Sequence, residues 1–194
     1  GPDPELRKTA VYVLGDIKTP ETLKLLKEII NSREISIDVR KAALHALADH
    51  EGEGAAAIIL QVAMSREEES LARRAVYALE DLLDENSVPQ LLKVYQATPF
   101  PGVKKAVIYS VEDADSPRSQ GVLQEMLKTE SDPELRRAMV YALADIENEK
   151  TVDILYDIIQ NDSSLRVRNA AVSALGDMDS AKAREVLRRI LEEN

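Results

Sequence analysis

Six aspartates have the most regular spacing among the residues that could bind a metal or move a proton. The first interval is 33 residues and the next four are 32, giving Asp16, Asp49, Asp81, Asp113, Asp145 and Asp177. If the copies that carry them stack as helices, successive carboxylates lie roughly 10 Å apart. Oxygens that share a calcium ion lie about 2.3–2.6 Å from it. We therefore interpret this column as structural and expect no metal site in it.

The two histidines form no metal pair, because His45 and His50 are five residues apart, about 140° around a helix. The chain has no Cys, no glycine-rich phosphate loop and no Gly-x-Ser-x-Gly elbow, and no serine has a plausible histidine partner. The sequence therefore predicts no catalytic residue, no cofactor and no metal. We expect a protein that is not an enzyme.

Composition narrows the class of protein further. The 194 residues include 25 basic and 35 acidic side chains, for a net charge of −10, and 44% are hydrophobic. That apolar fraction suits a buried core, and the charge argues against nucleic acid as a partner despite basic doublets such as Arg40-Lys41. No apolar run of about 18 residues occurs, so we expect no membrane insertion in this segment. The absence of Cys suits cytoplasm and periplasm equally.

The segments that position these residues are repeated along the chain. Asp3-Pro4-Glu5-Leu6-Arg7-Lys8 matches Asp132-Pro133-Glu134-Leu135-Arg136-Arg137, and four further copies follow the same pattern. Apolar residues recur at steps of three and four, which indicates helices and not strands. The copies are predicted to span residues 3–34, 35–66, 67–98, 99–130, 131–162 and 163–194.

Each copy divides into two helices joined by a short turn. Thr19-Pro20, Ser116-Pro117 and Asp132-Pro133 are each typical of an N-cap followed by proline at the first helical position. We predict twelve helices in six stacked pairs, since pairs this short bury their apolar faces only against neighbours. The pairs are expected to form one all-α domain over residues 3–194. Gly1-Pro2 looks like a protease-cleavage scar, so we expect the chain to be a module of a larger protein.

The first helices resemble HEAT-like repeats, in particular the short bacterial kind found in phycobilin lyases. Val39-Arg40-Lys41-Ala42-Ala43-Leu44 and Val167-Arg168-Asn169-Ala170-Ala171-Val172 carry the resemblance. It implies a right-handed α-solenoid, an α-α superhelix of six helix pairs whose second helices line the concave face. It also implies an alternative function, a lyase-like or chaperone-like helper for a tetrapyrrole-bearing protein. A purely structural or engineered repeat spacer is a further alternative.

Deoxyhypusine hydroxylase, another HEAT-repeat protein, holds iron with repeated His-Glu dipeptides. This chain has one such dipeptide, His50-Glu51, and places it in a turn. We do not expect that activity.

A basic column accompanies the aspartates. We predict that it pairs with them in a structural ladder between neighbouring repeats, while the aspartates also accept backbone N–H groups where the next helix begins. The basic members are Arg7, Arg40, Lys104, Arg136 and Arg168.

The second helices carry the residues that we expect to contact a protein or peptide partner. Several outward positions are apolar where solvent is expected, and charged residues border them, a pattern typical of recognition surfaces. The predicted surface comprises Lys27, Leu60, Met64, Leu92, Lys93, Gln124, Tyr156 and Arg188. An alternative is a register shift of one residue that would put these side chains in the core, because Gln90 falls in a core column.

A tyrosine column lies on the first helices, at Tyr12, Tyr77, Tyr109 and Tyr141. It is either an aromatic recognition stripe or a half-buried column whose hydroxyls reach water.

Overall fold

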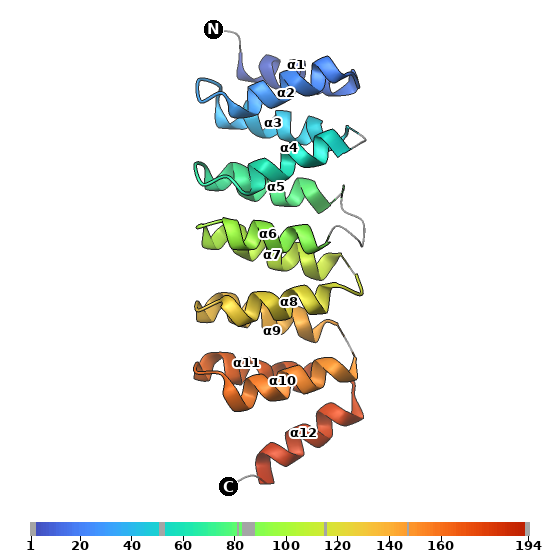
Figure 1. The fold of residues 1–194 in the computed structure, drawn as a ribbon, viewed down its shortest axis with the longest axis vertical. Helices are drawn as coiled ribbons and strands as arrows, with labels where there is room; N and C mark the ends of the chain where they lie inside the picture. The colour runs from blue at the N-terminus through green and yellow to red at the C-terminus, as the bar shows by residue number, and fades with distance from the viewer. Residues whose placement is uncertain are drawn as a thin grey trace. The chain divides into compact units, whose positions relative to one another are not determined.

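A computed structural model provides the structure of this chain. It describes residues 3–50, 53–80, 82, 88–114, 116–146 and 148–192. The described residues form twelve helices and no strand, as predicted (Figure 1). First helices alternate with second helices along the chain. The first helices are α1 (Pro4–Asp16), α3 (Ile37–Ala48), α5 (Glu69–Glu80), α7 (Pro101–Asp113), α9 (Pro133–Ala144) and α11 (Leu165–Asp177). The second helices are α2 (Pro20–Asn31), α4 (Glu53–Ala63), α6 (Val88–Ala97), α8 (Ser119–Thr129), α10 (Glu149–Asn161) and α12 (Ala181–Glu192).

Helix starts follow local chemistry. The Thr19 hydroxyl accepts the Thr22 N–H in a capping box at α2, and the Asp132 carboxylate accepts the Glu134 N–H at α9. Both predicted caps are therefore confirmed. The prediction for Ser116 is wrong, because α8 begins at Ser119. The Ser116 hydroxyl accepts the Arg118 N–H at 3.2 Å, which makes a separate turn before the helix.

The contacts divide the chain into two compact units, residues 1–110 and 111–194, with the boundary inside α7. In the first unit, α1 and α2 pack against α3, and α3 and α4 pack against α5. In the second, α8 and α10 pack against α9, and α9, α10 and α12 pack against α11. Each unit thus stacks consecutive helix pairs. A single domain over residues 3–194 stays a prediction.

The core follows the repeated apolar columns. Leu44, Val76, Ile108 and Val140 share one register position, and all four are fully buried. The second helices contribute a parallel column of fully buried residues, at Leu26, Ile59, Leu91, Leu123 and Leu155. Burial of this much apolar surface, and not intrinsic helix propensity, is what stabilises helices of 10 to 13 residues.

Two glycines in the same register position have different surroundings. A Cβ on Gly15 would lie 2.7 Å from the Cβ of Ala46 and 3.3 Å from its Cα, because α1 approaches α3 closely there. A Cβ on Gly176 would have no atom within 4 Å.

Alanine at these two glycines is expected to have opposite effects on stability. Gly15→Ala should lower the free energy of unfolding by about 1–2 kcal/mol, because overpacking against Ala46 outweighs the gain in helix propensity. Gly176→Ala should raise it by about 0.5 kcal/mol, because only the propensity changes. Urea denaturation of the two variants measures the difference. An equal loss in both would contradict the close approach at Gly15.

Candidate functional site

The predicted surface in the first unit lies on α2, α4 and α6. Lys27 and Lys93 are exposed, whereas Leu60, Met64 and Leu92 are half-buried. Leu60 and Met64 are four residues apart on α4 and therefore share one face of that helix. The apolar members thus keep part of their surface in contact with water.

Repeat three keeps the register of the other repeats. Leu91 occupies the fully buried column on α6, and Leu92, one residue further, remains half-buried. Gln90 is also half-buried. A shift that would place Leu92 in the core column is therefore wrong.

The predicted surface in the second unit lies on α8, α10 and α12. Gln124 and Tyr156 are half-buried, and Arg188 is exposed. The guanidinium of Arg189 lies over the Tyr156 ring, 5.0 Å from its centroid, and this cation–π contact holds the ring against α12. Lys182 and Asp153, 2.7 Å apart, form an ion pair that also joins α12 to α10.

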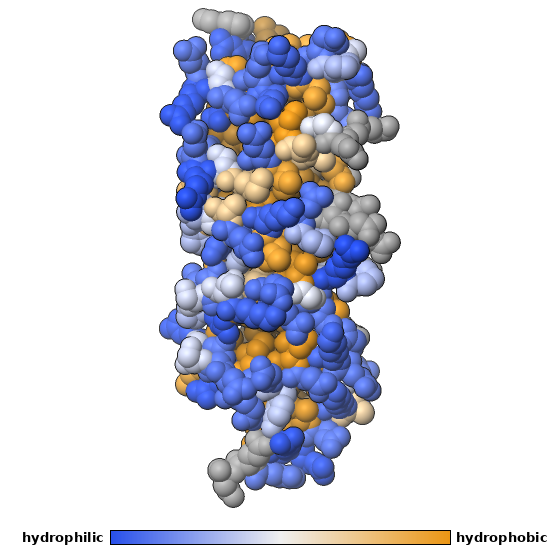
Figure 2. Space-filling model, viewed as in Figure 1, coloured by the Kyte–Doolittle hydropathy of each residue, from blue (hydrophilic) through white to orange (hydrophobic). Residues whose placement is uncertain are grey.

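The visible surface of each unit is amphipathic. Figure 2 shows patches of hydrophobic side chains in the middle of each unit's visible face, interrupted by hydrophilic side chains that also cover the margins. An amphipathic surface of this kind suits contact with a polypeptide, which offers both apolar side chains and charges. The assignment of these residues to partner binding stays a prediction.

Arg136 of the basic column joins three segments of the second unit. Its Nη1 donates to the carbonyl oxygens of Leu127 at 2.7 Å, in the last turn of α8, and of Glu130 at 2.9 Å, directly after that helix. Its Nε donates to Asp162 Oδ2 at 2.9 Å, and its Nη2 also pairs with that carboxylate. Asp162 lies directly after α10 and outside the aspartate column.

The other basic residues of the predicted ladder are placed differently. Arg40 is half-buried, and its Nε donates to the Ile30 carbonyl oxygen at 2.7 Å, at the end of α2. Lys104 lies over the Tyr95 ring, 4.8 Å from its centroid. Arg168 is half-buried and Arg7 is exposed. Arg40 and Arg136 thus bind the carbonyl end of the preceding second helix, where the helix dipole favours a cation.

The aspartate column lies at the ends of the first helices. Asp16, Asp49, Asp113, Asp145 and Asp177 are exposed, and Asp81 lies outside the described residues. Asp49 and Asp145 are C-terminal caps of α3 and α9. The ladder between aspartates and basic residues stays a prediction, and the ion pair of Arg136 goes to Asp162.

A second polar column lies three residues after the aspartates, and the sequence predicted its N-cap at Thr19 but not those at Asn148 and Ser180. Thr19 and Asn148 accept the backbone N–H groups of Thr22 and Thr151 where α2 and α10 begin, and Ser180 accepts that of Ala183 at α12. These residues have the N-cap role that we had assigned to the aspartates. Their shared offset of three residues was visible, but their differing types concealed the column.

The carboxyl groups of Glu112 and Asp145 interact in the second unit. Burial of Glu112, then its hydrogen bond to Asp145 and the nearby charges of Asp145 and Asp113, raises the pKa of Glu112 from 4.5 to about 7. Two neighbouring carboxyl groups retain a proton, because ionising both would place two negative charges close together.

Stability should therefore fall as pH rises from about 4.5 to 7. In this window the folded chain keeps a proton on Glu112 that the unfolded chain has released, so raising the pH favours unfolding. Glu112→Gln should flatten this slope and add about 1–2 kcal/mol at pH 7.5, a figure reduced for the partial exposure of the side chain. Urea denaturation across the window measures it, with exposed Glu185→Gln as the control. An unchanged slope in Glu112→Gln would contradict the shared proton.

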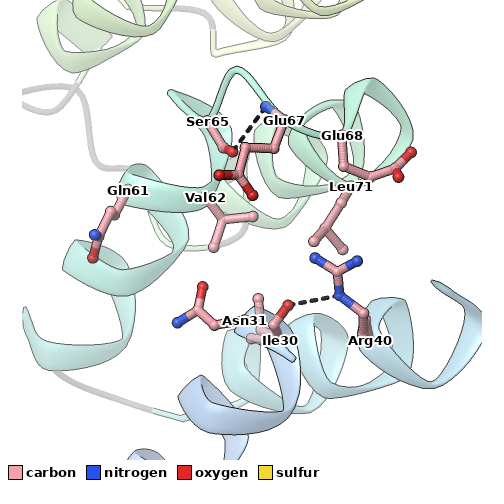
Figure 3. A pocket seen from close by; sticks show the side chains of 9 residues that line it. All are labelled: Ile30, Asn31, Arg40, Gln61, Val62, Ser65, Glu67, Glu68 and Leu71. Carbon is pink, nitrogen blue, oxygen red and sulfur yellow. Dashed lines mark hydrogen bonds between the residues drawn. The ribbon is translucent and has the colours of Figure 1, made fainter. Parts of the chain in front are cut away.

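A pocket of about 270 Å³ lies in the first unit, at the ends of α2 and α4 (Figure 3). Three buried apolar residues form its floor, namely Ile30, Val62 and Leu71. Polar side chains of Asn31, Arg40 and Gln61 line it as well. Because Asn31 and Gln61 belong to second helices, the pocket adjoins the predicted binding surface of this unit.

Comparison with known proteins identifies the repeat. A sequence model of HEAT repeats matches residues 1–80, 56–144 and 122–194, which together span the chain. The chain belongs to the HEAT-repeat family. Among solved structures, it is similar to the complex of CpcE and CpcF of phycocyanin lyase from a Nostoc species. The identity is 18% and the TM-score is 0.48, and the match covers 96% of this chain and 76% of that one. It is also similar to human deoxyhypusine hydroxylase in complex with glycerol, with 17% identity, a TM-score of 0.42, and coverage of 98% and 79%. No curated protein matches the chain.

The first helices of these HEAT repeats present the tyrosine column at the surface. Tyr12, Tyr77, Tyr109 and Tyr141 are 38–43% exposed. The amine of Lys105 lies 5.7 Å from the centroid of the Tyr109 ring, and His45 meets the Tyr12 ring edge-on at 6.1 Å. Both interpretations of the column remain open.

Two further classes of site are absent from the part of the chain that the structure describes. No cluster of three or more His, Asp or Glu side chains there is arranged to hold a metal ion. No helix in it combines the length and hydrophobicity that crossing a bilayer requires.

Proposed function

We propose that this HEAT-repeat chain is a non-enzymatic scaffold that binds a protein or peptide along its second helices. One observation carries the proposal. Leu60, Met64 and Leu92 keep part of their apolar surface exposed, although the core positions beside them are fully buried. Exposed charges at Lys27 and Lys93 border them in the same unit. Burial of partly exposed apolar side chains inside a polar border is the usual source of affinity in protein interfaces.

Binding also explains the chain better than catalysis does. The described residues that titrate abnormally, such as Glu112, take part in contacts within the chain, in this case with Asp145 of the next repeat. The pocket beside Arg40 offers hydrogen-bond donors and an apolar floor, and its two carboxylates, Glu67 and Glu68, are already bound to Arg33 and Ser70. The tetrapyrrole alternative stays a prediction, which the absorbance of bilin mixed with the protein would test.

Footprinting of a bound peptide tests the proposal. Peptides are first selected from a random display library on the immobilised full chain. Oxidative labelling is then compared with and without the selected peptide. Met64 and Tyr156, on second helices, should become protected, whereas Tyr77 and Tyr109, on first helices, should react as before. Protection of only the first-helix tyrosines, or no enriched peptide, would contradict the proposal.

A further inference from the structure

Repeats two and five use the same arginine in different ways. Arg40 and Arg136 are 96 residues apart, three periods of 32 residues, and each donates to a carbonyl oxygen at the end of the preceding second helix. Arg136 also binds the Asp162 carboxylate, whose side chain is only 1% exposed. A carboxylate of the chain itself thus fills the space beside Arg136.

No carboxylate fills that space in repeat two. Arg66 lies 96 residues before Asp162, but Ser65 makes the corresponding hydrogen bond. Each side chain accepts the backbone N–H two residues further on, Ser65 from Glu67 at 3.3 Å and Asp162 from Ser164 at 2.8 Å. The hydroxyl of Ser65 brings no negative charge to Arg40. The pocket lies at this position, and Ser65 and Arg40 both line it.

The end of the Arg40 guanidinium is available to a ligand. Its Nε is bound to the Ile30 carbonyl oxygen, and within the described residues Nη1 and Nη2 have no hydrogen-bond partner. Figure 3 shows this end pointing into the pocket, toward Leu71. Two parallel N–H donors on one guanidinium match the two oxygens of a carboxylate.

The two acidic residues at the pocket have other partners. Glu67 pairs with Arg33 at 2.8 Å, and Glu68 accepts a hydrogen bond from the Ser70 hydroxyl at 3.1 Å. Neither forms an ion pair with Arg40 in this described region, although the charge of Arg40, after the hydrogen bond and charge of Arg33, helps to lower the pKa of Glu67. The volume of about 270 Å³ falls below the roughly 300–1,000 Å³ of sites for drug-sized ligands, so it suits one residue of a larger partner.

We propose that this pocket binds a carboxylate of a peptide partner, with Nη1 and Nη2 of Arg40 donating to its two oxygens. The proposal rests on the proposed peptide-binding function and adds to it a defined anchor. The apolar floor accepts the carbon atoms next to the carboxylate. The carboxylate is either the C-terminus of the peptide or the side chain of an aspartate or glutamate.

Small probes test the pocket without any knowledge of the partner. The full chain is titrated with N-acetyl-leucine, N-acetyl-leucinamide and the α-amide of N-acetyl-glutamic acid, while NMR follows the Arg40 Nε signal and the Ser65 and Leu71 amides. We expect saturable shifts with at least one of the two carboxylates, with dissociation constants on the order of 1–10 mM, and none with the neutral amide. Tighter binding of N-acetyl-leucine assigns the site to a peptide C-terminus, and tighter binding of the glutamate amide assigns it to a side chain.

Three variants make the test specific. Arg40→Gln should weaken carboxylate binding by about tenfold or more, whereas Arg66→Gln, which removes the same charge from an exposed side chain nearby, should not. Ser65→Asp should place a carboxylate beside Arg40, as Asp162 does beside Arg136, and so abolish probe binding and raise the melting temperature. The Ser65→Asp variant keeps the test valid if Arg40→Gln fails to fold.

Two results would overturn the proposal, namely equal shifts with the neutral amide and unchanged carboxylate binding in Ser65→Asp. If no probe binds but selected peptides still protect Met64 and Tyr156, only the carboxylate pocket is wrong. If the probes bind but no peptide contacts the second helices, the pocket stands and the scaffold proposal is wrong.

Discussion

Arg136→Met should lower the free energy of unfolding by about 3–5 kcal/mol, because it leaves a buried charge without its partner. The Asp162 carboxylate is almost wholly buried, and Arg136 is its ion-pair partner. The same substitution removes the donor to the carbonyl oxygens of Leu127 and Glu130, so the end of α8 loses hydrogen bonds as well. Methionine keeps much of the apolar stem, so loss of packing contributes little.

Chemical denaturation of three variants measures this effect. Arg137→Gln is the matched control, because Arg137 is the next residue and its ion pair with Glu134, at 2.9 Å, lies near the surface, so the loss should stay under about 1 kcal/mol. The double variant Arg136→Met, Asp162→Asn should be more stable than Arg136→Met alone, since no unpaired charge remains. Equal stability of Arg136→Met and Arg137→Gln would show that the buried pair does not hold these segments together.

The sequence predicts the helices and their core well, because each repeat buries the same positions. Leu91 is an example, since its column is leucine or isoleucine in the five repeats from the first to the fifth and is fully buried in all of them. The start of α8 was not predictable, because Ser116 has the residue type of an N-cap but uses its hydroxyl in a preceding turn.

The polar contacts between repeats were harder to predict. Arg66, and not an acid, lies 96 residues before Asp162, and Ser65 makes the hydrogen bond instead, so residue type does not mark this position in both repeats. The pairing of Arg136 with Asp162 depends on how α8, α9 and α10 pack, and the sequence pattern does not specify that. The sequence pattern also does not specify how much of Leu60 and Leu92 is exposed. Helix periodicity shows which way a side chain points, whereas the distance to the next helix decides how much of it water can reach.

Replacing Leu60, Leu92 and Tyr156 together with alanine should weaken the binding of a selected peptide by about 100-fold. Loss of partly buried apolar anchors costs about 1 kcal/mol each in an interface, and the three lie on second helices, Leu60 and Leu92 in the first unit and Tyr156 in the second. The three residues also pack within the repeats, so a lower melting temperature accompanies the loss of binding. A charge reversal at exposed residues, Lys27→Glu with Lys93→Glu and Arg188→Glu, leaves the core intact and should also weaken binding to an acidic peptide.

The decisive measurement is calorimetric titration of one selected peptide into three proteins: the wild-type chain, the second-helix triple variant and a first-helix control. The control combines Tyr77→Ala, Tyr109→Ala and Tyr141→Ala. The control removes three large side chains from the first helices, where they are 38–41% exposed. Circular dichroism first verifies that both variants fold. If the second helices form the binding surface, affinity falls about 100-fold in the second-helix variant and stays within about threefold of wild type in the control. Unchanged affinity in the folded second-helix variant, with loss of binding in the tyrosine variant, would contradict the account.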